Sequence, residues 1–328
     1  MLAPLASLGQ RARDRAESRL VRAVYELPAN LSRLTPRARR AMAQVERLAD
    51  LPYLPTGLME HTLDVWRPPA GQKAREGLLP AVLYLHGGGF SLLSKDTHWS
   101  MALRFAARGM VVFNANYRLA PLHPFPAAVE DVCEAFLWVL RHAEEHGADP
   151  RRVILAGESA GANLAAALAV AAAFERPEPF ARRVYDASAP PVAVIAGCGF
   201  LQVSDPERFL RRRKLPRWLF ARIESTSRGY LGGASLPQDG PSLADPLLIL
   251  EQAQPTRALP PFFSFVGTRD PVLDDTRRLG VALERHGAAH LERYYPGEVH
   301  AFHAFDRPQA RQCWDETFDF LAAYMAPA

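Results

Sequence analysis

Short apolar runs recur along the chain and predict a series of strands. Residues 61–66 alternate between polar and apolar side chains, as a half-covered strand does. The other runs are rich in β-branched, aromatic or small apolar residues and are too short for helices, which is typical of strands buried inside a sheet. They lie at 81–85, 110–115, 153–156, 192–197, 262–267 and 291–295.

Between these runs, apolar residues recur at helical spacing. Over residues 127–146, Val129, Val132 and Phe136 fall on one side of the expected helix. Strands that alternate with helices predict an α/β fold, with a mostly parallel central sheet and helices on both faces. Further helices are expected from Ala160 onward, over 272–287 and over 308–325.

Two segments break this alternation. Residues 203–250 are arginine-rich and aromatic, with helical character and no strand pattern. Because this segment is inserted between two strands of the sheet, we expect it over the carboxyl ends of the strands, where ligands bind in such folds. Residues 1–58 are interpreted as helices and loops. We expect both segments to form a helical cap on a core made of residues 59–202 and 251–328.

Composition places the chain among ordinary globular proteins. Of its 328 residues, 48% are hydrophobic and 23% are charged. It has no apolar stretch long enough to span a bilayer, and its first residues lack the basic and apolar regions of a secretory signal. Three widely spaced cysteines, Cys133, Cys198 and Cys313, fit buried thiols in a reducing compartment, so a cytoplasmic location is expected.

The basic character of the chain changes this picture little. The formal net charge is +4, and the basic residues gather at 10–22 and 211–218. Neither cluster carries interleaved aromatic residues that could stack on bases, so nucleic acid is not expected as a partner. The first cluster fits an amphipathic helix whose apolar side is rich in alanine, and such a side is too small for stable membrane insertion.

The segment RVILAGESAGANLAAAL, at 152–168, places one serine at the junction of a strand and a helix. Gly157 and Gly161 flank Ser159 and permit the sharp turn that this junction requires. A G-x-S-x-G pattern between a strand and a helix is typical of a nucleophile elbow. Its helix would offer free N–H groups, starting near Ala160, to a developing negative charge. A capping serine in a glycine turn is the alternative.

A serine nucleophile needs oxyanion donors, a base and an acid that orients the base. HGGGF, at 86–90, follows a strand, and its glycines would let backbone N–H groups point at a ligand; a flexible turn is the alternative. Asp270 and His300 follow later strands in the required order. Asp274, Asp275 and His303 lie close by in sequence, so the residues alone leave the acid and the base open.

Four motifs occur together in one order along most of the chain. They are HGGGF at 86–90, NYRLAPLHPFPAAVED at 116–131, GESAGANLA at 157–165, and DPVLDD with YYPGEVHAFHAF near the end. In this combination the chain resembles the hormone-sensitive-lipase-like branch of α/β-hydrolase esterases. It departs from that family at Glu158, where aspartate is usual, and at Leu122, where glutamate is usual.

This resemblance implies an α/β-hydrolase fold with a helical cap and the hydrolysis of carboxylic esters, with short to medium acyl chains and no metal or cofactor. It implies Ser159 as nucleophile, Asp270 as acid and His300 as base. The implied oxyanion hole consists of Gly87, Gly88 and Ala160. The implied supporting residues are His86, Gly89, Glu158 and Tyr117.

Other functions remain open at this stage. An amidase, lactonase or peptidase could use the same triad, and a hydrolase-like fold could serve as a binding protein without catalysis. His142, Glu145 and His146 match the H-x-x-E-H pattern of a zinc peptidase, but a charged, solvated helix end is the favoured interpretation, because this helix already has an apolar face and no third ligand stands out. The expected partner is a small-molecule ester, and the resemblance also allows a homodimer built by edge-strand pairing.

Overall fold

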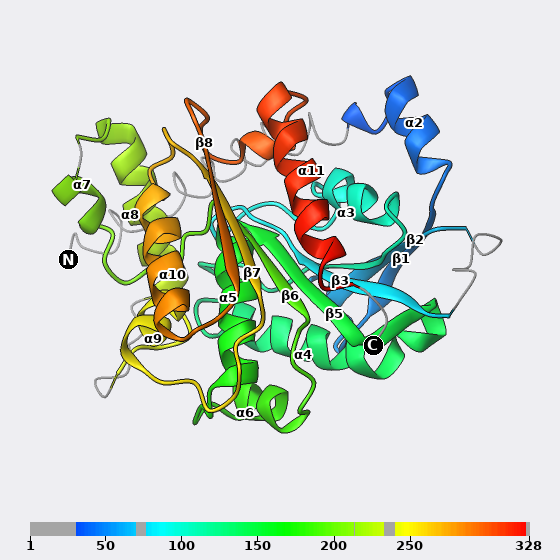
Figure 1. Cartoon of the computed structure of the whole chain (residues 1–328), viewed down its shortest axis with the longest axis horizontal. Coiled ribbons are helices and arrows are strands. Elements are labelled where there is room, and N and C mark those ends of the chain that lie inside the picture. Colours follow the sequence, from blue (N-terminus) through cyan, green and yellow to red (C-terminus); the bar gives the residue numbers. More distant parts are fainter. Residues whose placement is uncertain (1–30, 70–76, 213, 233–239, 326–328) are drawn as a thin grey trace, which may run out of the picture.

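The computed structural model describes residues 31–69, 77–212, 214–232 and 240–325. Within these ranges one eight-stranded sheet is flanked by helices (Figure 1). The strands are β1 (Glu46–Pro52), β2 (Thr62–Arg67), β3 (Leu79–Leu85), β4 (Val111–Ala115), β5 (Ala148–Glu158), β6 (Ala193–Gly197), β7 (Phe262–Gly267) and β8 (His290–Tyr295).

The helices occupy most of the chain between these strands. The α-helices are α2 (Pro36–Met42), α3 (Trp99–Ala106), α4 (Ala127–His142), α5 (Ala160–Ala173), α6 (Pro179–Asp186), α7 (Arg208–Arg212), α8 (Arg217–Leu231), α9 (Pro246–Gln252), α10 (Leu273–Arg285) and α11 (Pro308–Ala322). Short 3-10 helices are η1 (Met59–His61), η3 (Glu144–His146) and η4 (Phe302–Ala304). None of the helices in the described ranges has the length and apolar character needed to cross a bilayer.

The strand order in the sheet is β1-β2-β4-β3-β5-β6-β7-β8. The pairs β1–β2 and β2–β4 are antiparallel, and every other neighbouring pair is parallel. The prediction of a mostly parallel sheet is therefore confirmed. Because β3, β5, β6, β7 and β8 run in one direction, the loops that follow them leave from the same edge of the sheet.

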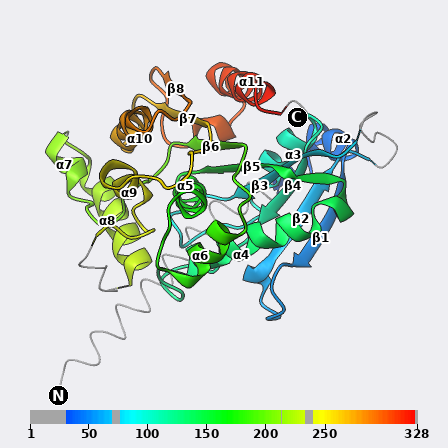
Figure 2. The same ribbon diagram turned by 60° about the horizontal axis from the view of Figure 1, so that its bottom comes forward.

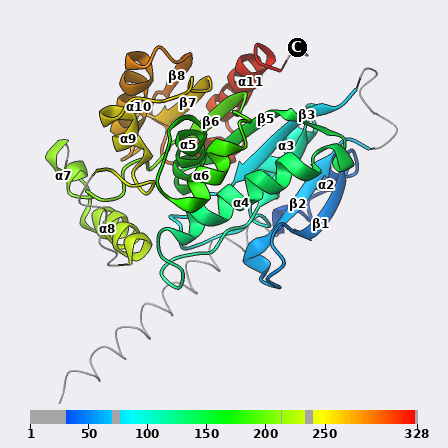
Figure 3. The ribbon, with the colours of Figure 1, turned by 90° about the horizontal axis from the view of Figure 1, so that it is seen from below.

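Helices cover both faces of the sheet, as predicted. One apolar cluster joins the sheet to α4, α5 and α6, and a second joins its other face to α3 and α11. Figure 2 shows α11 and α3 on one side and α4 and α6 on the other, and Figure 3 shows α4, α5 and α6 in front of the sheet. Every residue of α5 is buried, because this alanine-rich helix lies between the sheet and its neighbours.

The first 58 residues differ in part from the prediction of helices and loops. Residues 46–52 form strand β1, which pairs with β2 at the edge of the sheet. A register shift between Leu48 and Leu51, with Asp50 at a φ of 57°, interrupts the alternation of apolar and polar positions that would have indicated a strand. The basic helix expected at 10–22 lies outside the described residues.

The described part of 203–250 contains helices and no strand, as predicted. Helices α7 and α8 lie side by side beyond α10 (Figures 1 and 3). Helix α9 instead buries its apolar residues against α5 and α10. The outer part of this segment therefore consists of α7 and α8.

Candidate active site

Ser159 lies at the turn between β5 and α5, in a strained backbone conformation with φ of 56° and ψ of −116°. A non-glycine residue adopts positive φ only where its surroundings enforce it. Gly161 permits this tight turn, because a Cβ at this position would lie 2.0 Å from the carbonyl oxygen of Leu85 on β3. The glycine lets α5 start directly against the sheet, and the turn directs the serine side chain away from the strand end.

Ser159, His300 and Asp270 form a continuous hydrogen-bonded line. The imidazole of His300 places Nε2 2.9 Å from Ser159 Oγ and Nδ1 2.9 Å from Asp270 Oδ2. Asp270 lies in the loop after β7, and His300 lies between β8 and η4. Strands β7 and β8 are paired in parallel up to Gly267 and Tyr295, so these two loops begin side by side.

The surroundings of His300 favour its protonated form relative to free imidazole. Burial by itself lowers the pKa of His300, but the charge of Asp270 and the hydrogen bond to it outweigh burial, so the pKa is raised above the ordinary value of 6.5. Asp270 is buried and also accepts the N–H of Val272. A carboxylate held in this way fixes the imidazole tautomer that exposes Nε2 as a base toward the serine.

The other two candidate acids have different surroundings. Asp275 is buried in the first turn of α10, where it accepts the N–H groups of Leu201 and Gln202 and pairs with Arg208 at 2.6 Å. Asp274 pairs with Arg277 at 3.5 Å. Both carboxylates therefore bond to residues of α10 and its neighbours. Of the three candidate acids, Asp270 is the one that contacts His300.

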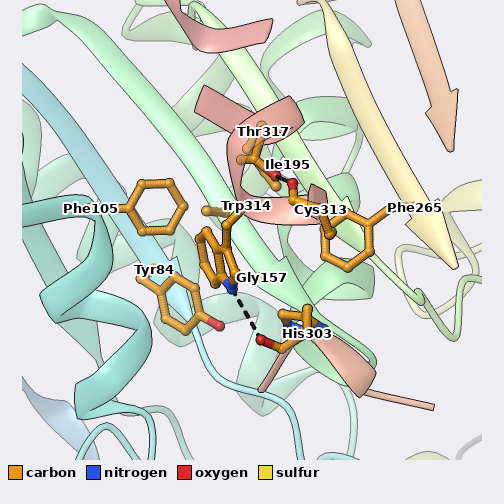
Figure 4. A pocket seen from close by; sticks show the side chains of 10 residues that line it. Tyr84, Phe105, Gly157, Ile195, Phe265, His303, Cys313, Trp314 and Thr317 are labelled. Atoms are coloured by element: carbon orange, nitrogen blue, oxygen red, sulfur yellow. Dashed lines mark hydrogen bonds between the residues drawn. The ribbon is translucent and has the colours of Figure 1, made fainter. Parts of the chain in front are cut away.

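His303, the other candidate base, lies in the core beneath the site. Its ring packs edge-on against Phe265 with 4.9 Å between ring centroids, and its carbonyl oxygen accepts the indole N–H of Trp314 (Figure 4). It borders a small cavity of about 10 Å³ that Tyr84 also lines. Burial lowers the pKa of His303 to about 4, so its imidazole is neutral at physiological pH.

Residues 86–90, the glycine loop, follow β3, and their contacts correct the predicted set of oxyanion donors. The N–H of Gly87 donates to Glu158 Oε1 at 2.5 Å, so it is not available to an oxyanion. Gly87 must be glycine for this contact, because a Cβ there would lie 2.7 Å from the same oxygen. Among the described residues, no hydrogen bond engages the N–H groups of Gly88, Gly89 or Ala160. The loop thus leaves Gly88 and Gly89, rather than Gly87 and Gly88, as free donors beside Ala160.

The chain is similar to proteins of known name and known structure. Residues 82–304 match a protein family described by the alpha/beta hydrolase fold. The chain is 31% identical over 281 residues to esterase LipI of Mycobacterium tuberculosis, covering 77% of this chain and 80% of that one. It is also 31% identical to an acetyl-hydrolase of Streptomyces hygroscopicus, covering 80% of each. A crystal structure of an esterase from the bacterial hormone-sensitive lipase family superposes with a TM-score of 0.69 at 26% identity, covering 93% of this chain and 91% of that one.

The chain belongs to the hormone-sensitive-lipase-like α/β hydrolases. As in the esterases to which it is similar, carboxylic ester hydrolysis is its reaction class.

The carboxylate of Glu158 holds the glycine loop of this hydrolase in place by accepting the N–H of Gly87. Besides the Gly87 N–H, it accepts the hydroxyl of Tyr84 and lies 2.8 Å from His98 Nε2. Burial alone would raise the pKa of Glu158, but the charge of His98 and the hydrogen bonds lower it to about 2. Sequence analysis missed Tyr84 and His98, because a polar contact across a folded loop leaves no periodic signal.

His86 and Tyr117 support the start of the same loop. Their rings stack with 4.3 Å between centroids, and the Tyr117 hydroxyl donates to the His86 carbonyl oxygen at 2.7 Å. Burial lowers the pKa of His86 to about 3, so it is a neutral structural group. Two aromatic residues thus fix the point at which the chain leaves β3.

Helix α8 reaches the opposite side of the glycine loop. A Cβ on Gly89 would lie 3.1 Å from Thr226 Cγ2 of α8, and Phe90 stacks on Tyr230 of α8 with 3.7 Å between ring centroids. Helix α8 is therefore in direct contact with the segment that carries the free N–H groups.

The alternative zinc motif does not assemble a ligand set. His142 bonds to Glu145 at 3.0 Å, and both His142 and His146 stack on the ring of Trp138. In the ranges that the structure describes, the one grouping of three residues with suitable ligand atoms within reach of each other is Cys198, Asp270 and His300, two of which belong to the hydrogen-bonded line at Ser159.

Proposed function

We propose that this hydrolase cleaves esters with short to medium acyl chains through an acyl-enzyme on Ser159. The observation that carries the proposal is the line of hydrogen bonds from Ser159 Oγ through His300 to Asp270. An unassisted serine hydroxyl is a weak nucleophile, and this arrangement supplies both the base and the group that orients it.

The proposed reaction has two steps. Ser159 Oγ attacks the ester carbonyl carbon while His300 Nε2 accepts the hydroxyl proton, and His300 then returns this proton to the departing alcohol. In the second step, His300 takes a proton from a water molecule whose oxygen attacks the acyl carbon, and His300 then gives this proton to Ser159 Oγ as the acid is released. In both steps the oxyanion is bound by the N–H groups of Gly88, Gly89 and Ala160, where donors aligned beforehand act in the transition state.

Short acyl chains are favoured by the names of two similar proteins, an acetyl-hydrolase and an ethyl acetate hydrolase. The covering helices α7 and α8 are proposed to be the cap, since α8 touches the glycine loop through Thr226 and Tyr230. A small-molecule ester is the proposed partner, without nucleic acid or membrane insertion.

A cytoplasmic location and a homodimer complete the proposal. Three free, buried cysteines, Cys133, Cys198 and Cys313, fit a reducing compartment. Strand β8 forms one edge of the sheet and could pair with its copy in a second chain. Sedimentation velocity measures the oligomeric state directly. A monomer at all concentrations would refute the proposed dimer.

The test of the proposed function is a panel of aryl esters with graded acyl length, run beside an anilide and a lactone. We expect turnover of the shorter esters to exceed that of the long ones and of the anilide and lactone. Ser159→Ala should lower turnover by about 10⁶-fold, as removal of a triad serine does elsewhere. Ser188→Ala, on an exposed loop, is the control. Ester turnover in Ser159→Ala within about tenfold of the parent would refute the assignment.

A further inference from the structure

Glu158 places a buried negative charge directly behind the proposed oxyanion hole. Its side chain is only 5% exposed, and Oε1 accepts the N–H of Gly87, next to the free donors Gly88 and Gly89. A carboxylate at this position opposes the negative charge that develops on an oxyanion, because like charges repel strongly where water is excluded. An oxyanion hole built on it therefore needs a compensating positive charge.

His98, at the start of α3, is surrounded by hydrogen-bond acceptors. Its Nε2 lies 2.8 Å from Glu158 Oε1. Its Nδ1 lies 2.9 Å from Thr97 Oγ1 and 3.2 Å from the carbonyl oxygen of Ser94. The Thr97 hydroxyl donates to the Ser94 carbonyl oxygen at 2.7 Å, so it is an acceptor toward His98. A neutral imidazole carries one N–H and would leave one nitrogen facing an acceptor without a proton; the imidazolium satisfies both.

Three titratable groups that the structure places beside His98 are uncharged. His86 and Tyr84 come from the end of β3 and His303 from η4. Burial lowers the pKa of His86 to about 3 and of His303 to about 4, and raises the pKa of the Tyr84 phenol. Burial also lowers the pKa of His98, but Glu158 more than reverses this effect, so the pKa is raised. Glu158 and His98 are thus the charged pair of this cluster.

We propose that His98 is a positioning residue that works as a buried imidazolium: it cancels the charge of Glu158 and holds its carboxylate on the Gly87 amide, so that Gly88 and Gly89 present their N–H groups to the oxyanion. This inference rests on the proposed esterase function. His98 does not touch substrate, and it acts on the reaction through Glu158 and the glycine loop.

The first test separates the charge of His98 from its hydrogen bond. His98→Gln keeps a donor for Glu158 but carries no charge. Because an oxyanion hole acts in the transition state, we expect kcat to fall at least about tenfold while KM stays within about threefold. Inhibition by a boronic acid, which forms a tetrahedral anionic adduct on the serine, should weaken by a similar factor.

A second substitution tests the cancellation of charge. Adding Glu158→Gln to His98→Gln removes the unpaired carboxylate, so the double variant should recover part of the lost kcat. A residue with a merely structural role would give additive losses, with no recovery. His142→Gln is the matched control, since His142 also bonds a glutamate, Glu145, but at the surface. Its kcat and KM should equal those of the parent.

The unaltered protein supplies an independent measurement if His98→Gln fails to fold. Nitrogen-15 NMR of the histidine rings, with His98 assigned through contacts to the Tyr84 ring, should show both ring nitrogens protonated at pH values well above 6.5, the ordinary pKa of histidine. A singly protonated His98 at neutral pH, or a folded His98→Gln with unchanged kcat, would overturn the inference. An inactive parent would instead refute the esterase function, so the two failures are distinct.

Discussion

Leu85 and Gly157 are register partners on the neighbouring parallel strands β3 and β5. The chain leaves β3 as the glycine loop and leaves β5 as the serine turn, so this pairing sets the proposed oxyanion donors beside the proposed nucleophile. The contact is tight, because a Cβ on Gly157 would lie 2.7 Å from the Leu85 carbonyl oxygen. The active site is therefore assembled by the sheet itself.

Gly161 makes this close approach testable. Gly161→Ala would place a methyl group 2.0 Å from the Leu85 carbonyl oxygen, and backbone would have to move. We expect the free energy of unfolding to fall by about 3 kcal/mol or more, with loss of turnover. Gly229→Ala is the control, because that position in α8 has open space and should stay neutral or gain slightly. Chemical denaturation measures both, and equal stability of the two variants would contradict the packing described.

The two histidines of the HAFHAF segment should respond differently to removal. His300→Ala removes the proposed base and should abolish ester turnover while leaving the fold intact. His303→Ala leaves a cavity in the core, so its free energy of unfolding should fall by about 2–4 kcal/mol while much of its turnover remains. Turnover and denaturation curves measured on both variants decide the matter. The opposite ranking in turnover would mean that His303 is the base.

The pH dependence of turnover should report His300. The imidazole accepts a proton only when it is neutral, so kcat/KM should rise with pH through a pKa above the ordinary 6.5, since Asp270 raises it. Asp270→Asn removes the negative charge, which should move this limb to lower pH and reduce kcat by about 10⁴-fold. A pH–rate profile with the same limb in both enzymes would show that Asp270 does not act on the base.

The contact between α7 and α10 depends on a buried ion pair. Arg208→Ala would leave the Asp275 carboxylate, which is 1% exposed, without its partner at 2.6 Å. Removal of one member of a buried pair costs about 3–5 kcal/mol, and thermal denaturation should show this loss. Arg182→Ala is the control, since Arg182 forms its pairs with Glu175 and Asp186 at the surface. Equal melting temperatures would mean that the Arg208 pair contributes little.

Much of the fold follows from local sequence because its central strands are short, apolar and regularly separated by helices. Every strand predicted at 61–66 and beyond forms, and α5 begins at Ala160 as expected. Strand β1 was missed because its register shift near Asp50 breaks the alternation. Helices α3 and α6 were not predicted, since each has eight residues and no side-chain cap hydrogen bond to mark its start.

The part of the candidate site that depends on the order and direction of the strands could be predicted from the sequence. Parallel strands bring their following loops to one edge, so the places after strands indicated Ser159 and a short set of acids and histidines, and the family resemblance then selected Asp270 and His300. The choice of Gly87 as a donor was wrong, because the direction of its N–H depends on Glu158, which approaches from another strand. His98 and Glu158 are 60 residues apart in the sequence, and no sequence pattern indicates that they meet in the fold.

The most direct test of the central claim is covalent labelling. A fluorophosphonate reacts with a serine only when a base and an oxyanion hole activate it. We predict stoichiometric loss of ester hydrolysis with one adduct, located on Ser159 by peptide mass spectrometry and absent from Ser159→Ala. An adduct on another residue, or ester hydrolysis that persists after complete labelling of Ser159, would contradict the account.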